Sequence, residues 1–181
     1  MDAHEPTEDP AGPLFETARL AVHALGDEHL DAMCAVYGDA DAMRYVDDGE
    51  PLDRATCVKW IEVTRGNVSR RGYGMSAVVR RDTGEVAGFC GLVHPGGQPE
   101  AELKYAFHRD HRGRGLATEA TRGLLAWGAR RFGLSEVIAT VAPGNAASLA
   151  VLGRLGMRHA STRRNDDGSL TEVHVWRIAD A

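Results

Sequence analysis

The stretch that decides the fold runs from Glu102 to Ala120 and reads ELKYAFHRDHRGRGLATEA. Its first part, Glu102 to Phe107, predicts a strand, and Leu116 opens an amphipathic helix. Between them lies a loop of alternating arginine and glycine, Arg112 to Gly115. Glycines let backbone amides approach a ligand, a helix start offers unpaired N–H groups, and arginines add forked donors with permanent charge. Strand, basic glycine loop and helix in this order predict a phosphate-binding site.

The loop does not match the familiar nucleotide motifs. It lacks the Gly-Lys-Ser/Thr ending of a P-loop, and it is not the G-x-G-x-x-G of a dinucleotide-binding βαβ unit. An RNA-binding arginine–glycine segment is disfavoured, because such segments are repeated and lie in basic chains, whereas this one occurs once in a chain of formal net charge −5. An ordinary surface turn before a helix is the plainer alternative.

Three blocks of the sequence resemble one enzyme family, the GNAT N-acetyltransferases. The loop Arg112-Gly113-Arg114-Gly115-Leu116-Ala117 is similar to the acyl-CoA-binding motif of that family, Gln/Arg-x-x-Gly-x-Gly/Ala. Glu16 to Leu20 resembles the opening strand of the ribosomal-protein N-terminal acetyltransferase-like (Rim-type) branch. Asn145 to Ser148, followed by Leu155 to Met157, resembles its second cofactor motif. The resemblance extends over about residues 15–178 and implies an enzyme that uses acetyl-CoA.

The order of expected elements favours an α+β fold. Strands are expected at 18–24, 73–80, 86–93, 100–107, 137–141, 157–164 and 170–178, and helices at 27–37, 51–70, 116–132 and 146–155. Asp27 and Asp53 are expected N-caps, and Gly133 is an expected C-cap. Hairpins near both ends argue against a doubly wound sheet. The family resemblance implies a mixed, mostly antiparallel central sheet flanked by helices, in which the strands at 100–107 and 137–141 splay apart to admit the pantetheine arm.

Composition limits the class of protein. The 181 residues suffice for one domain, which is expected at 14–181. The acidic, proline-containing tail at 1–13 is expected to be disordered and not to be a signal peptide. The mild acidity argues against a nucleic-acid partner, and no apolar run approaches the roughly 20 residues that span a bilayer. Three widely spaced cysteines fit reduced thiols of a cytoplasmic protein, and no Cys/His spacing suggests a metal site.

The resemblance assigns coenzyme contacts residue by residue. Backbone groups of Phe107 and His108 would contact the pantetheine arm, and Asn145 and Ser148 would bind the arm from the other side. The pyrophosphate would be cradled by Arg112, Gly113, Arg114, Gly115, Leu116, Ala117 and Thr118. The helix-start residues Asn145 and Ser148 could equally serve as ordinary capping groups.

Amine acylation needs a base for the acceptor ammonium, and the strand at 100–107 offers Glu102. Alternate strand residues share a face, so Leu103, Tyr105 and Phe107 are expected to meet packed helices, while Glu100, Glu102 and Lys104 face the acceptor side. Related enzymes have a glutamate at the position of Glu102. Burial must raise its pKa if it is to act as a base. The alternative is a solvated strand carboxylate.

The sequence offers less for protonation of the leaving thiolate. Many relatives use a tyrosine seven residues after the motif asparagine, where this chain has Leu152. The hydroxyl of Ser148 is the expected acid or hydrogen-bond donor; the alternative is that the coenzyme thiolate leaves unaided. Cys90 could suggest an acyl-cysteine intermediate, but it lies mid-strand without a nearby histidine and is expected to be a core residue.

These features predict an acyl-CoA-dependent N-acyltransferase that moves acetyl to a primary amine by direct attack in a ternary complex. The alternative is a catalytically silent acyl-CoA-binding sensor or scaffold. A protein N-terminus, a polyamine or amino acid, and an aminoglycoside-like metabolite all remain open as acceptors.

Two acidic loops, with Asp47, Asp48 and Glu50 in one and Asp166 and Asp167 in the other, would attract a cationic amine, or they are merely solvated turns. A homodimer is compatible with the resemblance; no membrane partner is expected.

Overall fold

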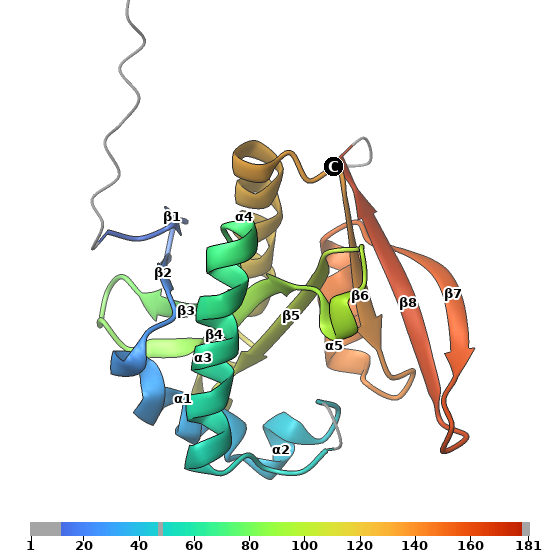
Figure 1. The fold of residues 1–181 in the computed structure, drawn as a ribbon, viewed down its shortest axis with the longest axis horizontal. Coiled ribbons are helices and arrows are strands. Elements are labelled where there is room, and N and C mark those ends of the chain that lie inside the picture. The colour runs from blue at the N-terminus through green and yellow to red at the C-terminus, as the bar shows by residue number, and fades with distance from the viewer. Residues whose placement is uncertain (1–11, 47–48, 179–181) are drawn as a thin grey trace, which may run out of the picture.

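The computed structural model describes residues 12–46 and 49–178 and shows a twisted sheet with helices on both faces (Figure 1). The strands lie in the order β1-β2-β3-β4-β5-β6-β8-β7. Within the described residues, all neighbouring pairs run antiparallel except β5 and β6. The mixed, mostly antiparallel α+β sheet is therefore confirmed. Residues 1–11 of the expected disordered tail lie outside the described residues.

The strands are β1 (Phe15–Glu16), β2 (Leu20–Ala24), β3 (Met75–Arg80), β4 (Val86–Val93), β5 (Glu102–Phe107), β6 (Glu136–Val141), β7 (Arg158–Arg164) and β8 (Leu170–Arg177). The helices are α1 (Leu30–Tyr37), α2 (Ala40–Met43), α3 (Arg54–Arg71), α4 (Leu116–Phe132) and α5 (Ala146–Arg154), with 3-10 turns at Asp27–His29, Pro95–Gly97 and Arg109–His111. Among the described residues, no helix combines the length and the apolar character needed to cross a membrane.

Local capping chemistry sets most helix ends. The Asp53 carboxylate accepts a hydrogen bond of 2.8 Å from the Thr56 amide at the start of α3. Gly133 ends α4 with a φ of 66°, as its expected C-cap role requires. The expectation that Asp27 caps the first helix is wrong. Gly26 begins a 3-10 turn there, and its amide donates to Nδ1 of His29, so α1 starts only at Leu30.

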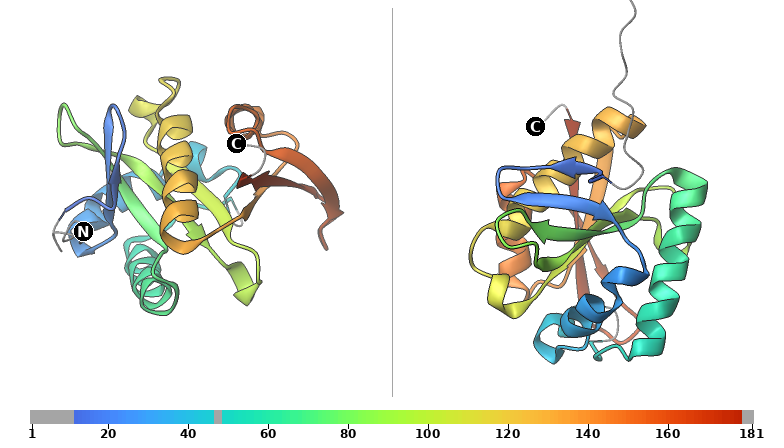
Figure 2. Two further views of the ribbon diagram at one scale, coloured as in Figure 1. Left: turned by 90° about the horizontal axis from the view of Figure 1, so that it is seen from above. Right: turned by 90° about the vertical axis from the view of Figure 1, so that its left-hand side faces the viewer.

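Each face of the sheet has its own core. Leu103 and Phe107 of β5 pack with Leu124 of α4 on one face, while Ala106 of β5 packs with residues of α1 and α3 on the other. In Figure 2, left, α4 (orange) and α3 (teal) lie on opposite sides of the sheet. The expected alternation along β5 is therefore confirmed for Leu103 and Phe107, and this strand separates two chemically different sides.

The sheet forks between β5 and β6. The two strands share a single register pair, Glu102 with Ile138, and the Ile138 amide donates to the Ala101 carbonyl at 2.9 Å. β6 then continues with β8 and β7, and these strands turn away from the rest of the sheet in Figure 2, left. The expected splaying of these strands is confirmed. Glu102 lies at the closed root of the fork.

Candidate functional site

A cavity of about 1190 Å³ lies at the open end of the fork. Its walls come from the end of β5, the glycine loop with the start of α4, the start of α5, and the segment around α2. Lining residues include Tyr45, Tyr105, Phe107, Arg112, Gly113, Gly115, Leu116, Ala117, Thr118, Asn145 and Ser148. Most of the residues expected to hold the coenzyme thus surround one cavity, although they come from distant parts of the sequence.

The glycine loop needs its glycines. Gly113 and Gly115 have φ values of 71° and 75°, in the left-handed region that other residues avoid. A Cβ on Gly113 would meet nothing within 4 Å, so its backbone is open. Gly115 is the N-cap of α4 and provides no side chain to cap the helix. The first-turn amides of a long helix are therefore left for a ligand.

Thr118 gives an independent sign of a missing partner. Its side chain lines the cavity and is 6% exposed, yet its Oγ1 has no hydrogen-bond partner among the described residues. An unsatisfied buried hydroxyl costs about 1–3 kcal/mol. A phosphate at the start of α4 would satisfy this donor, so the residues present fit the coenzyme that the family resemblance implies.

More arginines lie around this cavity than the two that the glycine-loop motif contains. Beside Arg112, its lining includes Arg19, Arg44, Arg122 and Arg154, whereas Arg114 and His108, also expected at the coenzyme, do not line it. Within the described part of the chain, the Arg114 guanidinium makes no ion pair, whereas Arg19 pairs with Glu119 at 2.6 Å. The additional four arginines are dispersed along the sequence, so only the tertiary structure reveals them as a basic wall.

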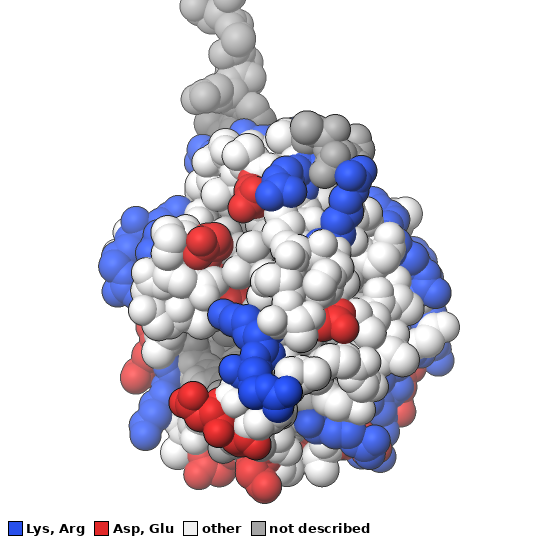
Figure 3. All heavy atoms as spheres, turned by 90° about the vertical axis from the view of Figure 1, so that its right-hand side faces the viewer, with Lys and Arg blue, Asp and Glu red and all other residues white. Residues whose placement is uncertain are grey.

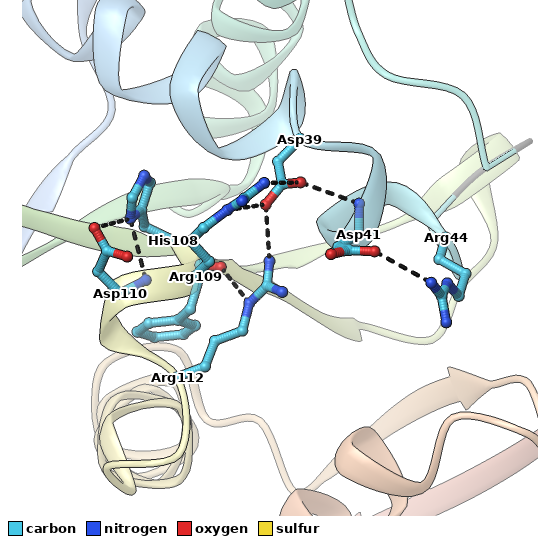
Figure 4. A network of polar contacts seen from close by, with 8 residues as sticks. Asp39, Asp41, Arg44, His108, Arg109, Asp110 and Arg112 are labelled. Carbon is cyan, nitrogen blue, oxygen red and sulfur yellow. Dashed lines mark hydrogen bonds and ion pairs between the residues drawn. The ribbon is translucent and has the colours of Figure 1, made fainter.

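Arg112 is turned toward the protein backbone. Its Nε donates to the Phe107 carbonyl at 2.9 Å, and its guanidinium lies 3.7 Å from Asp39 (Figure 4). The His108 amide donates to the Ala87 carbonyl at 2.9 Å. The Phe107 carbonyl and the His108 amide, expected to contact pantetheine, are therefore already engaged within the protein.

Asp39 joins the α2 segment to the coenzyme loop. Its carboxylate accepts hydrogen bonds of 2.8 and 3.2 Å from Arg109, and one of 3.1 Å from the Asp41 amide (Figure 4). The hydrogen bond from Arg109 is the main reason that the pKa of Asp39 is lowered. No sequence pattern marks this contact, because the two partners are 70 residues apart.

Glu102 is buried and fully engaged. The residue is 3% exposed, and its carboxylate accepts from Gln98 at 3.1 Å and from the hydroxyl of Thr140. The Lys104 ammonium lies 2.5 Å away. Buried carboxylates of this kind are normally paired. Glu102 does not line the cavity; alternation along β5 places Glu102 and Lys104 on the face of Ala106, opposite Leu103 and Phe107. The solvated-carboxylate alternative is therefore wrong.

On the cavity side, Ser148 forms a pair that the sequence did not reveal. Its hydroxyl lies 2.6 Å from the phenol oxygen of Tyr105. Burial raises the pKa of Tyr105, and the hydrogen bond with Ser148 opposes this shift. Asn145 caps α5 by accepting from the Ser148 amide at 3.1 Å. The capping role of Asn145 is thus observed, and the Ser148 hydroxyl remains available for a second role.

Among the acidic residues proposed for the acceptor side, the described ones, Glu50, Asp166 and Asp167, do not line the cavity. Asp47 and Asp48 lie outside the described residues. Asp166 and Asp167 lie exposed in the turn between β7 and β8, and Asp167 accepts from the Ser169 hydroxyl and amide. These hydrogen bonds lower the pKa of Asp167. Figure 3 views the molecule from the side on which β7 and β8 lie in Figure 1; basic side chains are spread over this face, and acidic ones gather toward its lower left, with others scattered above.

Cys90 is a core residue, as expected. It is fully buried in β4, and burial raises the pKa of its thiol to about 12. Such a thiol provides almost no thiolate near neutral pH. A covalent acyl-cysteine route through Cys90 therefore has no structural support.

Comparison with known proteins identifies the family. A family model described as acetyltransferase (GNAT) domain matches residues 19–158. YkkB, an uncharacterised protein of Bacillus subtilis, is 33% identical over 153 residues, which cover 82% of this chain and 87% of that protein. An acetyltransferase structure from Agrobacterium tumefaciens has 26% identity and a TM-score of 0.74, over 90% of this chain and 93% of that one.

A further solved structure shares the fold at lower identity. RimL, a ribosomal alpha-N-protein acetyltransferase in complex with coenzyme A, gives a TM-score of 0.79 at 17% identity, over 93% of this chain and 99% of that one. This likeness shows the fold alone, so the Rim-type branch remains a prediction. The match of the family model to most of the chain places the protein in the GNAT family of acetyltransferases.

Proposed function

We propose that this chain transfers acetyl from acetyl-CoA to a primary amine by direct attack in a ternary complex. The observation that carries the proposal is the fork cavity, in which open glycine backbone, uncapped helix amides and the unsatisfied Thr118 hydroxyl converge. The solved relative RimL was captured with coenzyme A, which supports the same cosubstrate here.

Chain groups along the cavity would hold different parts of acetyl-CoA. The amides around Gly113 and Gly115 and the hydroxyl of Thr118 would bind the pyrophosphate. Arg114 lies in the same loop and has no ion pair among the described residues, so it would add positive charge nearby. Asn145, which lines the cavity, would contact the arm. The bound cosubstrate supplies an activated thioester. The wall around Tyr105 and Ser148 would then surround its sulfur.

The two faces of β5 separate two chemical tasks. Tyr105 and Ser148 line the cavity on the α4 and α5 side, whereas Glu102 lies on the opposite face. We propose Glu102 as the base that takes the acceptor proton, directly or through water, once Lys104 moves aside. The Lys104 side chain is 43% exposed, so water would hydrate its ammonium once it leaves Glu102 and the Thr140 hydroxyl. A base and a thiolate-stabilising group on opposite faces suit direct transfer through the fork.

The proposal includes three classes of acceptor: a protein N-terminus, a polyamine or amino acid, and an aminoglycoside-like metabolite. Preference for a cationic amine, drawn by Asp166 and Asp167 and by Asp47 and Asp48, stays a prediction. The three cysteines are free thiols, which supports the proposed cytoplasmic location. A homodimer also stays a prediction.

A thiol-release screen tests the proposal. Purified protein is mixed with acetyl-CoA and a panel of amines that includes short peptides, polyamines, amino acids and aminoglycosides. Release of free thiol that requires one amine class, together with the acetylated product by mass spectrometry, supports acetyl transfer. Tight coenzyme A binding with no amine-dependent release across the panel would instead indicate the silent binding module.

A further inference from the structure

The pair formed by Tyr105 and Ser148 has a geometry that the motif of the family does not explain. Tyr105 extends from β5 and Ser148 from the first turn of α5, 43 residues later. Their oxygens are 2.6 Å apart, and both residues line the coenzyme cavity. A short contact between two hydroxyls at the end of the proposed pantetheine path calls for a chemical role.

The direction of the hydrogen bond follows from the chemistry of the two groups. A phenol is a stronger acid than an aliphatic hydroxyl, so Tyr105 is the better donor. Burial raises the pKa of Tyr105, which keeps the phenol protonated. With Tyr105 as donor, Ser148 Oγ is the acceptor. No other partner of Ser148 Oγ is present within the described ranges, so its own hydrogen is free to point into the cavity.

We infer that Tyr105 is a positioning residue, which holds the Ser148 hydroxyl so that its hydrogen points at the sulfur of the departing coenzyme A thiolate. This inference rests on the proposed acetyl transfer. A hydroxyl that accepts one hydrogen bond becomes a better donor in another, because chains of hydrogen bonds polarise one another. Tyr105 therefore both fixes the rotamer of Ser148 and strengthens its outgoing hydrogen bond.

The balance of the transfer step is simple. The acceptor nitrogen forms a bond to the acetyl carbon, and the carbon–sulfur bond breaks with its electron pair on sulfur. Ser148 stabilises that charge by a hydrogen bond and keeps its proton, because a phenol with a raised pKa is a poor source for replacing it. The proton of the acceptor leaves on the other face of β5, toward Glu102 or water. Ser148 and Glu102 therefore do not compete for the same proton.

This role differs from a purely structural one in a measurable way. If the hydrogen bond to sulfur exists, it must lower the pKa of the thiol in enzyme-bound coenzyme A, since it favours the charged form. A hydrogen bond that only tied α5 to β5 would leave that pKa unchanged. The thiol pKa is read from the ultraviolet absorbance of the thiolate in a pH titration of the complex, without any acceptor amine.

The test compares Tyr105→Phe, Ser148→Ala and the double variant with Tyr73→Phe. Tyr73 is a matched control, since it is buried and its hydroxyl makes a 2.9 Å hydrogen bond to His94, outside the cavity. Tyr105→Phe should lower kcat about 10-fold, with less than about twofold change in KM for acetyl-CoA. It should also raise the pKa of the bound thiol by about one unit, since a tenfold change in rate and a shift of one pKa unit correspond to the same free energy. Tyr73→Phe should change neither.

The double variant should be no slower than Ser148→Ala alone, because Tyr105 acts through Ser148. Additive losses in kcat, or a bound-thiol pKa that is the same in Tyr105→Phe and the unchanged protein, would overturn the inference while acetyl transfer still stands. Failure of the unchanged protein to bind coenzyme A in calorimetry would overturn both the proposed function and this inference.

Discussion

The ion pair of Glu102 and Lys104 provides a demanding test of the proposed base. The Glu102 carboxylate accepts from Gln98 and Thr140 and lies 2.5 Å from the Lys104 ammonium. Glu102→Gln keeps the shape but removes the charge, and should lower kcat by roughly 10²- to 10⁴-fold, the usual loss of a general base. At about 1.36 kcal/mol per factor of ten, that is about 2.7–5.4 kcal/mol of activation free energy.

Lys104→Met separates catalysis from structure. It breaks the same ion pair but leaves the carboxylate in place. Because Glu102 is buried but keeps its hydrogen bonds from Gln98 and Thr140, loss of the lysine should cost about 1–3 kcal/mol of folding stability. The variant should keep kcat within about threefold. Turnover is measured at saturating acetyl-CoA, and stability by urea unfolding. Near-native turnover in Glu102→Gln, or equal losses of kcat in both variants, would show that Glu102 has only a structural role.

Two further predictions concern Glu119 and Cys90. Burial raises the pKa of Glu119, but hydrogen bonds from Thr17 and Arg19 outweigh this effect, so the pKa is lowered in the folded protein. The carboxylate therefore stabilises the fold at pH values above its unfolded-state pKa of about 4.5, and this contribution is lost as the pH falls below that value. Glu119→Gln should therefore reduce the free energy of unfolding by about 2 kcal/mol near pH 7, and the difference should close in acid; a gap independent of pH would contradict this. Cys90→Ala should retain most of kcat, and the intact mass of the unchanged protein after mixing with acetyl-CoA should show no added acetyl group; an acetylated Cys90 peptide would refute direct transfer.

The parts of the fold that local chemistry sets were predictable. The bounds of α4 follow from an apolar stripe that begins after Gly115 and ends at Gly133, and both signals lie within the helix or next to it. The two residues of β1 were missed, since so short a strand has no periodicity to detect. Asp27 was a wrong N-cap because the His29 side chain bonds back to Gly26 and closes a different turn.

The site was predictable only where its residues are neighbours in sequence. The glycine loop and Thr118 belong to one motif, and they line one cavity. The contacts of Tyr105 with Ser148 and of Asp39 with Arg109 join distant segments, and nothing in a single sequence marks such pairs. Alternation placed Tyr105 on the helix side of β5, but it could not show that the phenol reaches the cavity.

The central claim is that the glycine loop at the fork is the coenzyme site, and a matched pair of variants tests it most directly. Gly115 and Gly133 flank the same helix with φ values of 75° and 66°, so a side chain imposes a similar backbone strain of about 1–2 kcal/mol at either position. Only Gly115 lines the cavity. Gly115→Glu places a negative charge where phosphate oxygens would bind, whereas Gly133→Glu places it at the far end of α4.

The decisive measurement is the calorimetric titration of coenzyme A into the unchanged protein and these two variants. The structure predicts micromolar binding by the unchanged protein and an affinity within about threefold of this value for Gly133→Glu. Gly115→Glu should show no measurable binding, because like charges at about 4 Å repel by roughly 4 kcal/mol near a protein surface. Equal affinity in Gly115→Glu and Gly133→Glu would contradict the assignment of the fork cavity as the coenzyme site.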